Sequence, residues 1–245
     1  MEKINVTIYN EYLHELSEEK IAKVYPKGIH GAIIEMLEKR NPGKYNFRVA
    51  NFNMPSHGLT DDVIENTDVL IWWGHMAHNE VDDEVVEKIV KKVWEKGLGL
   101  IVLHSAHYSK PFRRLMGTSC RLKWRESDDR ERLWIMDPAH PITKGIPESI
   151  ELPHEETYGE RFEIPAPDQL IMMGWFEGGE VFRSGCCYHR GLGKIFYLQP
   201  GHESYPTYYN EDIIHIIDNA IDWAKFSGGP TPNYGNFKSL EEKYK

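Results

Sequence analysis

Histidine and glutamate side chains recur in four short segments, each directly after a predicted strand. The segments begin at Asn10, Gly74, His104 and Pro200. Since the carboxyl ends of parallel strands meet at one edge of an open sheet, we expect these segments to converge. Histidine titrates near neutral pH and binds metals, and glutamate acts as a base or a ligand. The spacing predicts one site with these members: Glu11, His14, His75, His78, His104, Ser105, His107, His202 and Glu203.

Two kinds of chemistry fit this cluster. Histidines combined with carboxylates suit Zn²⁺ or a similar divalent ion in an open three-ligand site, with His75, His104 and His202 as the predicted ligands. The same groups could instead act as acids and bases without a metal. The HMAH and HSAH spacings lie on turns after strands, so they indicate a metal less specifically than a helical H-E-x-x-H does.

Other catalytic groups have weaker support. Ser105 follows a predicted strand, but Leu103 and His107 occupy the positions of the glycines in a G-x-S-x-G elbow. Cys186 and Cys187 fall inside a predicted strand, where we expect buried packing. The chain has neither a G-x-G-x-x-G motif nor a P-loop, so we expect no nucleotide cofactor.

The elements that position these groups alternate along the chain. Apolar, β-branched runs predict strands at 4–9, 47–52, 68–73, 100–103, 169–175, 181–188 and 194–199. Helical spacing predicts helices at 28–40, 81–94 and 211–226. This order indicates one doubly wound α/β domain over residues 1–226. Residues 227–245 are rich in Pro, Gly and Asn and predict a C-terminal arm or tail.

Residues 117–163 break the alternation, and we expect an irregular excursion out of the sheet there. Glu155, Glu156 and Tyr158 lie in this segment. They form either a solvated acidic loop or a group folded back over the site, with a carboxylate as general base or ligand. The basic residues between 121 and 132 alternate with acids. They predict a self-paired surface, with a subunit contact or a rim for an anionic substrate as alternatives.

Composition excludes several classes of function. The 245 residues carry a net charge of −9, which disfavours binding to nucleic acid. Without an apolar run of eighteen residues or a signal-peptide pattern, we expect neither a membrane span nor secretion. Three cysteines do not form a disulfide framework and fit a cytoplasmic protein.

Four motifs together resemble a known family. GLGLIVLHSAH, DPAHPITKGIP, EETY and GLGKIFYLQPGHE occur in this order between residues 97 and 203. They resemble the motifs of the ThuA-like (trehalose utilisation) family, within the class I glutamine amidotransferase-like superfamily. The resemblance extends from the first strand to about residue 226. It implies a flavodoxin-like three-layer sandwich with a mostly parallel sheet.

The resemblance also implies a role in the catabolism of trehalose or related glucosides and their keto forms. The shared polar positions of the family fall on His104, Glu156, Tyr158 and His202, which are the predicted catalytic residues. The remaining polar groups are expected to bind substrate: Glu11, His14, His30, His75, His107 and Glu203. The superfamily's cysteine nucleophile is absent, because its elbow reads His104-Ser105-Ala106 here. We therefore do not expect a glutaminase.

Three functions stay open from the sequence. The first is an isomerase or lyase that moves a proton next to the carbonyl of a keto-sugar. The second is a metal-dependent hydrolase in the same pocket, and the third is a non-catalytic sugar-binding or regulatory subunit. We also expect a homo-oligomer, because Trp124, Trp134 and the C-terminal arm resemble contact elements. A sugar dehydrogenase is the expected functional partner.

Overall fold

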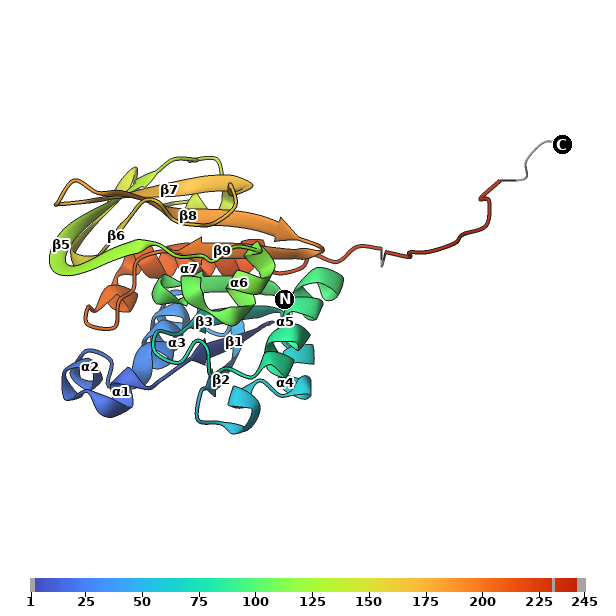
Figure 1. The fold of residues 1–245 in the computed structure, drawn as a ribbon, viewed down its shortest axis with the longest axis horizontal. Coiled ribbons are helices and arrows are strands. Elements are labelled where there is room, and N and C mark those ends of the chain that lie inside the picture. Colours follow the sequence, from blue (N-terminus) through green and yellow to red (C-terminus); the bar gives the residue numbers. More distant parts are fainter. Residues whose placement is uncertain (1–2, 231, 242–245) are drawn as a thin grey trace.

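The computed structural model describes residues 3–230 and 232–241, which contain one nine-stranded sheet (Figure 1). The strands lie in the order β2-β1-β3-β4-β9-β8-β7-β5-β6. Their bounds are β1 (Ile4–Asn10), β2 (Tyr45–Asn51), β3 (Val69–Trp73), β4 (Gly99–Leu103), β5 (Lys123–Ile135), β6 (Ser149–Gly159), β7 (Gln169–Phe176), β8 (Val181–Arg190) and β9 (Gly193–Leu198). From β2 to β9 the neighbours are parallel, and from β9 to β6 they are antiparallel.

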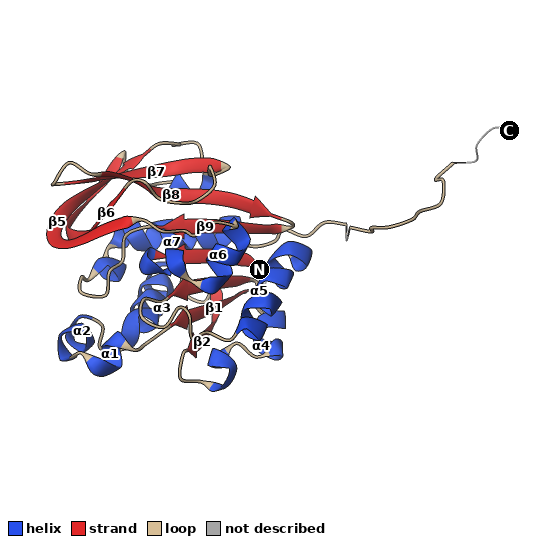
Figure 2. Ribbon diagram, in the orientation of Figure 1, coloured by secondary structure: helices blue, strands red, loops and turns tan. Residues whose placement is uncertain are grey.

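Helices cover both faces of the parallel strands (Figure 2), which confirms the predicted three-layer α/β fold. The helices are α1 (His14–Ser17), α2 (Glu19–Val24), α3 (Gly28–Arg40), α4 (Asp61–Glu65), α5 (Asp83–Lys96), α6 (Lys110–Met116) and α7 (Glu211–Ala224). One buried core contains side chains of α3 and α7, and the other contains those of α5 and α6. Successive strand residues alternate between these cores. Trp73 belongs to the first and Trp72 to the second, so both tryptophans of β3 are part of the buried core.

The predicted irregular excursion at 117–163 is wrong in part, because it contains the long strands β5 and β6. β5 joins the sheet between β7 and β6. The first half of β5 is exposed on both faces, so it has no apolar alternation from which a strand could be predicted. Two irregularities in its register with β6, around Asp129, disturb the pattern further. The antiparallel strands curl to one side of the molecule (Figure 1).

The structure also bears on the predictions for the cysteines, the C-terminal arm and a membrane span. Cys186 and Cys187 are buried in β8, as predicted. The described residues of the C-terminal arm, 227–230 and 232–241, form no helix or strand and extend away from the domain (Figure 1). Residues 231 and 242–245 of the predicted arm lie outside the described residues. Within the described ranges, no helix combines the length and the apolar character that crossing a membrane requires.

A buried carboxylate ties α7 to the start of β2. Asp218 accepts a hydrogen bond from the Tyr45 hydroxyl and further bonds of 2.9 Å each from Lys44 Nζ and Asn41 Nδ2. Burial alone would raise the pKa of Asp218, but the bonds from Tyr45 and Lys44 bring it below its ordinary value. The charged carboxylate therefore stabilises the folded state.

We expect Asp218→Asn to lower the free energy of unfolding at pH 7 by about 1–3 kcal/mol. The reason is that the three donors around residue 218 would lose a charged acceptor. A lowered pKa stabilises the fold above the ordinary value near 4, and this stabilisation disappears as the pH falls through the folded pKa. The deficit should therefore shrink in acid. Urea unfolding at pH 7 and pH 3 measures it, with Glu148→Gln, which removes an exposed carboxylate, as the control. An equal deficit at both pH values would contradict the assignment.

Candidate active site

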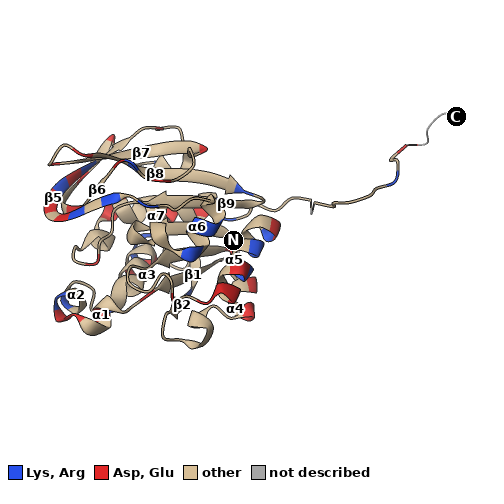
Figure 3. Cartoon of the chain, viewed as in Figure 1, with Lys and Arg blue, Asp and Glu red and all other residues tan. Residues whose placement is uncertain are grey.

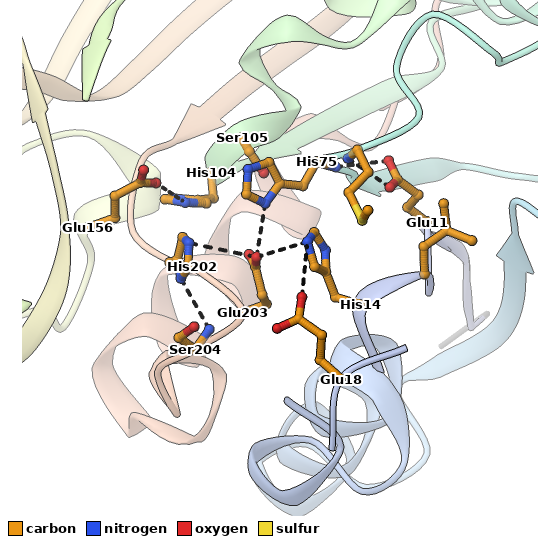
Figure 4. Close-up of polar contacts among 12 residues, drawn as sticks. Glu11, His14, Glu18, His75, His104, Ser105, Glu156, His202, Glu203 and Ser204 are labelled. Atoms are coloured by element: carbon orange, nitrogen blue, oxygen red, sulfur yellow. Dashed lines mark hydrogen bonds and ion pairs between the residues drawn. The ribbon is translucent and has the colours of Figure 1, made fainter. Parts of the chain in front are cut away.

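The predicted convergence of the strand ends is visible in the structure (Figure 4). Glu11 and His14 follow β1, His75 follows β3, and His104 follows β4. The turn after β9 adds His202 and Glu203, and the edge strand β6 contributes Glu156 and Tyr158. The side chains form two contiguous groups in which potential ligand atoms lie within 4.8 Å of one another: His104, Glu156 and His202, and His14, His75 and Glu203.

The backbone of His104 has an uncommon conformation at the end of β4. Its φ is +50°, in the left-handed region that side chains other than glycine rarely occupy. Such a conformation costs about 1–3 kcal/mol and is typical of residues at functional sites. The side chain has no solvent exposure, and the ring of Tyr158 stacks on it with 4.9 Å between centroids. The turn thus directs an imidazole into the interior.

The hydrogen bonds of His104 define where a proton must lie. Its Nδ1 is 2.7 Å from the carbonyl oxygen of Gln199, and a carbonyl only accepts, so Nδ1 carries a hydrogen. Its Nε2 lies 3.0 Å from Oε2 of Glu156. A bare Nε2 and an ionised carboxylate would repel each other at this distance. A proton, on the ring or on the carboxyl group, or a metal ion must therefore lie between them.

The charged pair satisfies this requirement without a metal. Burial would lower the pKa of His104, but the hydrogen bond with Glu156 raises it overall. Burial would raise the pKa of Glu156, but the hydrogen bond with His104 lowers it overall. Both directions favour an imidazolium beside a carboxylate.

Strand geometry explains why Glu156 and Tyr158 act together. Residues two apart in a strand point to the same face, so both side chains of β6 face His104. The Tyr158 hydroxyl lies 3.4 Å from His104 Nε2. Burial raises the pKa of Tyr158 well above its ordinary value, so the phenol keeps its proton at neutral pH. It is therefore available as a proton or hydrogen-bond donor.

His202 differs from His104 in its protonation state. The backbone N–H of Ser204 donates to its Nδ1 at 3.2 Å, so Nδ1 is an acceptor and the proton of the neutral ring lies on Nε2. Burial, with the nearby charge of His104, lowers the pKa of His202 to about 4. A neutral ring that carries its proton on Nε2 is a donor there. The predicted ligand set of His75, His104 and His202 is therefore divided between the two groups, and His202 is not a ligand through Nε2 in this state.

The second group surrounds Glu203. Its Oε1 lies 3.0 Å from His75 Nδ1 and 3.4 Å from His14 Nε2. Such separations are close to the edge of a tetrahedron with ligands about 2.0–2.1 Å from a zinc ion. Nδ1 of His14 and Oε2 of Glu203 are buried without a hydrogen-bond partner among the described residues. The three side chains could therefore hold a divalent cation.

Two further buried carboxylates hold the turns that carry these side chains. Glu11 accepts the N–H of His75 at 2.9 Å and that of Met76 at 2.8 Å. Glu155 accepts the N–H of Gly201 at 3.0 Å and that of His202 at 3.1 Å. Glu11, predicted to bind substrate, thus acts through the turn after β3. The role of Glu155 was not predicted, because the sequence alone does not distinguish it from the adjacent Glu156. Only their position in β6 shows that the two side chains point to opposite faces.

A cavity of about 380 Å³ opens beside the first group. Its lining comprises His75, His78, Ser105, His107, Tyr108, Arg121, Leu122, Trp124, Glu156 and Tyr158. His104 is not among these residues, so it acts through Glu156 rather than on a ligand. Ser105 donates its hydroxyl to the carbonyl of Gly74 at 2.8 Å, which leaves it a poor nucleophile. Trp124 supplies an aromatic face that the sequence analysis assigned to a subunit contact.

His30 is separate from the cavity. Its Nδ1 lies 3.0 Å from Asn10 Nδ2, and its ring contacts Tyr12 edge-on. Asn10 in turn donates to the buried carboxylate of Glu15 at 2.7 Å. His30 thus belongs to the network that fixes the start of α3. We predicted that His30 binds substrate, but its side chain is not part of the cavity lining, so the structure gives no support for this role.

The chain was compared with models of known protein families, with curated proteins and with solved structures. The model of the family described as "Trehalose utilisation" matches residues 5–224. The chain belongs to the ThuA family. Curated proteins give no significant match.

Solved structures show the same fold at low sequence identity. A ThuA-like protein from Parabacteroides merdae superposes with a TM-score of 0.65 at 14% identity, over 94% of this chain and 93% of the other. A ThuA-like protein from Bacteroides uniformis gives 0.58 at 15%, over 90% of both chains. A glutamine amidotransferase from Thermotoga maritima gives 0.54 at 11%, over 91% and 98%. The ThuA-family chain therefore has the amidotransferase-like scaffold, as predicted.

We expect Glu155→Gln to destabilise the protein by about 1–3 kcal/mol, because the new amide nitrogen would face N–H donors that need an acceptor. Urea unfolding measures the loss. Glu148→Gln removes an exposed carboxylate and serves as the control, with an unfolding free energy close to that of the wild type. Equal stability of the two variants would show that Glu155 does not hold the turn after β9.

Proposed function

We propose that this ThuA-family protein is an enzyme of carbohydrate catabolism that moves a proton next to the carbonyl group of a keto-sugar. One observation carries the proposal: Glu156 lies at the cavity wall with Oε2 3.0 Å from the buried Nε2 of His104. The Glu156 carboxylate is ionised at neutral pH and lines the cavity, so it is in the state and the place to accept a proton from a bound substrate. A dehydrogenase acting earlier on the same sugar would supply the carbonyl group.

The reaction follows from the positions of the groups. Glu156 removes the proton from the carbon beside the carbonyl, and the electron pair moves onto the carbonyl oxygen. Tyr158, as a neutral phenol, donates to that oxygen and stabilises the resulting enediolate. Return of the proton to the former carbonyl carbon, while the hydroxyl proton on the deprotonated carbon passes to the former carbonyl oxygen, gives an isomer. Departure of a group from the other carbon bonded to the deprotonated carbon, while the electron pair on oxygen re-forms the carbonyl, instead gives a lyase reaction.

The proton transfer can be tested without knowing which of the two products forms. Purified protein is incubated with 3-keto-glucosides in D₂O, and NMR follows deuterium incorporation beside the carbonyl. We expect incorporation by the wild type and a loss of about 10² or more in Glu156→Gln, because the base is removed. His104→Gln should lower the rate as well, since it leaves Glu156 without its partner.

His189→Gln is the matched control, because His189 is an exposed histidine on β8 away from the cavity lining. Its rate should equal that of the wild type. An unchanged rate in Glu156→Gln would contradict the proposal. Saturable sugar binding without incorporation would instead favour a binding subunit.

The group of His14, His75 and Glu203 supports a second candidate, a metal-dependent hydrolase. We propose that these residues bind a divalent cation, with Zn²⁺ the best match to their nitrogen and oxygen donors. His75 also lines the cavity, so an ion held there would be within reach of a bound ligand. Such an ion would polarise a carbonyl oxygen or activate a water molecule.

Plasma mass spectrometry of protein purified without chelators or added metal tests this site. We expect about one divalent ion per chain, lost in Glu203→Gln and His14→Ala because each removes a ligand. Glu156→Gln should retain the ion. Loss of the ion in Glu156→Gln, with retention in Glu203→Gln, would assign it to the other group. A protein with no ion would leave only the acid–base function.

A further inference from the structure

Arginine pairing distinguishes one part of the cavity wall from the rest of the molecule. Nine of the eleven arginines form an ion pair with a carboxylate: Arg40, Arg48, Arg114, Arg125, Arg130, Arg132, Arg161, Arg183 and Arg190. Along the ribbon of β5, basic and acidic residues are interspersed (Figure 3). Within residues 3–230 and 232–241, Arg113 and Arg121 have no carboxylate partner. Both are associated with the cavity.

Arg121 lines the cavity directly. Its backbone is fixed, because its carbonyl accepts the N–H of Glu163 at 2.8 Å. Its guanidinium makes no hydrogen bond or ion pair with any described residue. Arg121 is exposed at the cavity wall, so its unpaired guanidinium is accessible to an anionic group of a bound ligand.

Arg113 adds to the positive potential at this wall. Its guanidinium lies over the ring of Tyr108, 4.3 Å from the centroid, and its Nε is buried without a partner among the described residues. Its Nη2 donates only to the neutral Asn79, at 3.1 Å. Tyr108 separates Arg113 from the cavity, so Arg113 acts by charge and Arg121 by contact.

The neighbouring wall is suited to a polyhydroxylated ring. Trp124 is 64% exposed and lines the cavity, where it offers an aromatic face. His107 donates from Nδ1 to the carbonyl of Cys120 at 2.7 Å, so Nε2 of the neutral ring is an acceptor. Burial lowers the pKa of His107 to about 3, which keeps it neutral. The wall thus combines a hydroxyl acceptor, an aromatic surface and a free guanidinium.

We propose that the substrate is an acidic carbohydrate, whose carboxylate or phosphate group binds the guanidinium of Arg121 while Trp124 contacts the sugar ring. This inference rests on the proposed function and specifies its substrate class. Guanidinium groups bind carboxylates and phosphates bidentately, so one contact would fix both position and orientation. The anionic group would lie at Arg121 rather than at Glu156, since two anions repel. The carbonyl is thereby directed towards Glu156.

Calorimetric titration with three cyclic probes tests the proposal: D-glucuronate, D-glucose 6-phosphate and neutral D-glucose. We expect the wild type to bind at least one of the two acids about tenfold or more tightly than glucose. The preferred acid identifies the group as a carboxylate or a phosphate. Arg121→Gln should lose the preference while its affinity for glucose stays unchanged.

Arg130→Gln is the control, because Arg130 is a half-buried arginine of β5 whose charge is paired with Glu151 of β6 and which does not line the cavity. It should keep the preference of the wild type. Equal affinity for acids and glucose, no binding of either acid, or a preference that persists in Arg121→Gln would overturn the proposal. Deuterium incorporation into neutral keto-glucosides is a separate readout. A failure of acid recognition in the titrations would therefore leave the evidence for proton transfer intact. A failure of deuterium incorporation would likewise leave the binding result intact.

Discussion

The site depends on the contact between Nε2 of His104 and the carboxylate of Glu156, 3.0 Å apart in the protein interior. The ring proton on Nδ1 of His104 is already donated to the carbonyl oxygen of Gln199. The contact between Nε2 and Glu156 is therefore stable only with a further proton or a cation between these two groups. The burial of both residues makes that requirement strict, because water cannot screen a bare lone pair facing a carboxylate. The left-handed backbone conformation of His104 and the stacking of Tyr158 on its ring place the imidazole for this contact.

Buried carboxylates also organise the rest of the site. Glu11 and Glu155 each accept two backbone N–H groups from the turns after β3 and β9, and so fix His75 and His202. The glycine before His202 is required for the same turn. Gly201 has a φ of +132°, and a Cβ there would lie 2.0 Å from the Tyr208 hydroxyl. The family motif that ends in Gly-His therefore reflects a steric constraint as well as a functional one.

Sequence patterns predicted the parallel half of the fold because its strands and helices are buried on regular faces. The continuous run at 69–73 and the apolar face of α5 are examples. The expectation that the carboxyl ends of parallel strands meet at one edge of the sheet also identified side chains that lie close together in the structure: His14, His75, His104, His202 and Glu203. β5 escaped prediction because its first half is solvated on both faces. The spacing of the histidines in the sequence does not predict their division into two groups. It does not predict the tautomer of His202 either, because that depends on the hydrogen bond from the backbone N–H of Ser204 to Nδ1.

The charge state of His104 is the central claim, and ¹⁵N NMR of histidine-labelled protein measures it most directly. The His104 signals are assigned by their loss in His104→Gln. At pH 7 the charged pair predicts a ring protonated on both nitrogens, because Glu156 raises its pKa against the effect of burial. A neutral ring with a bare Nε2, or one with Nε2 bound to a metal, would contradict the account.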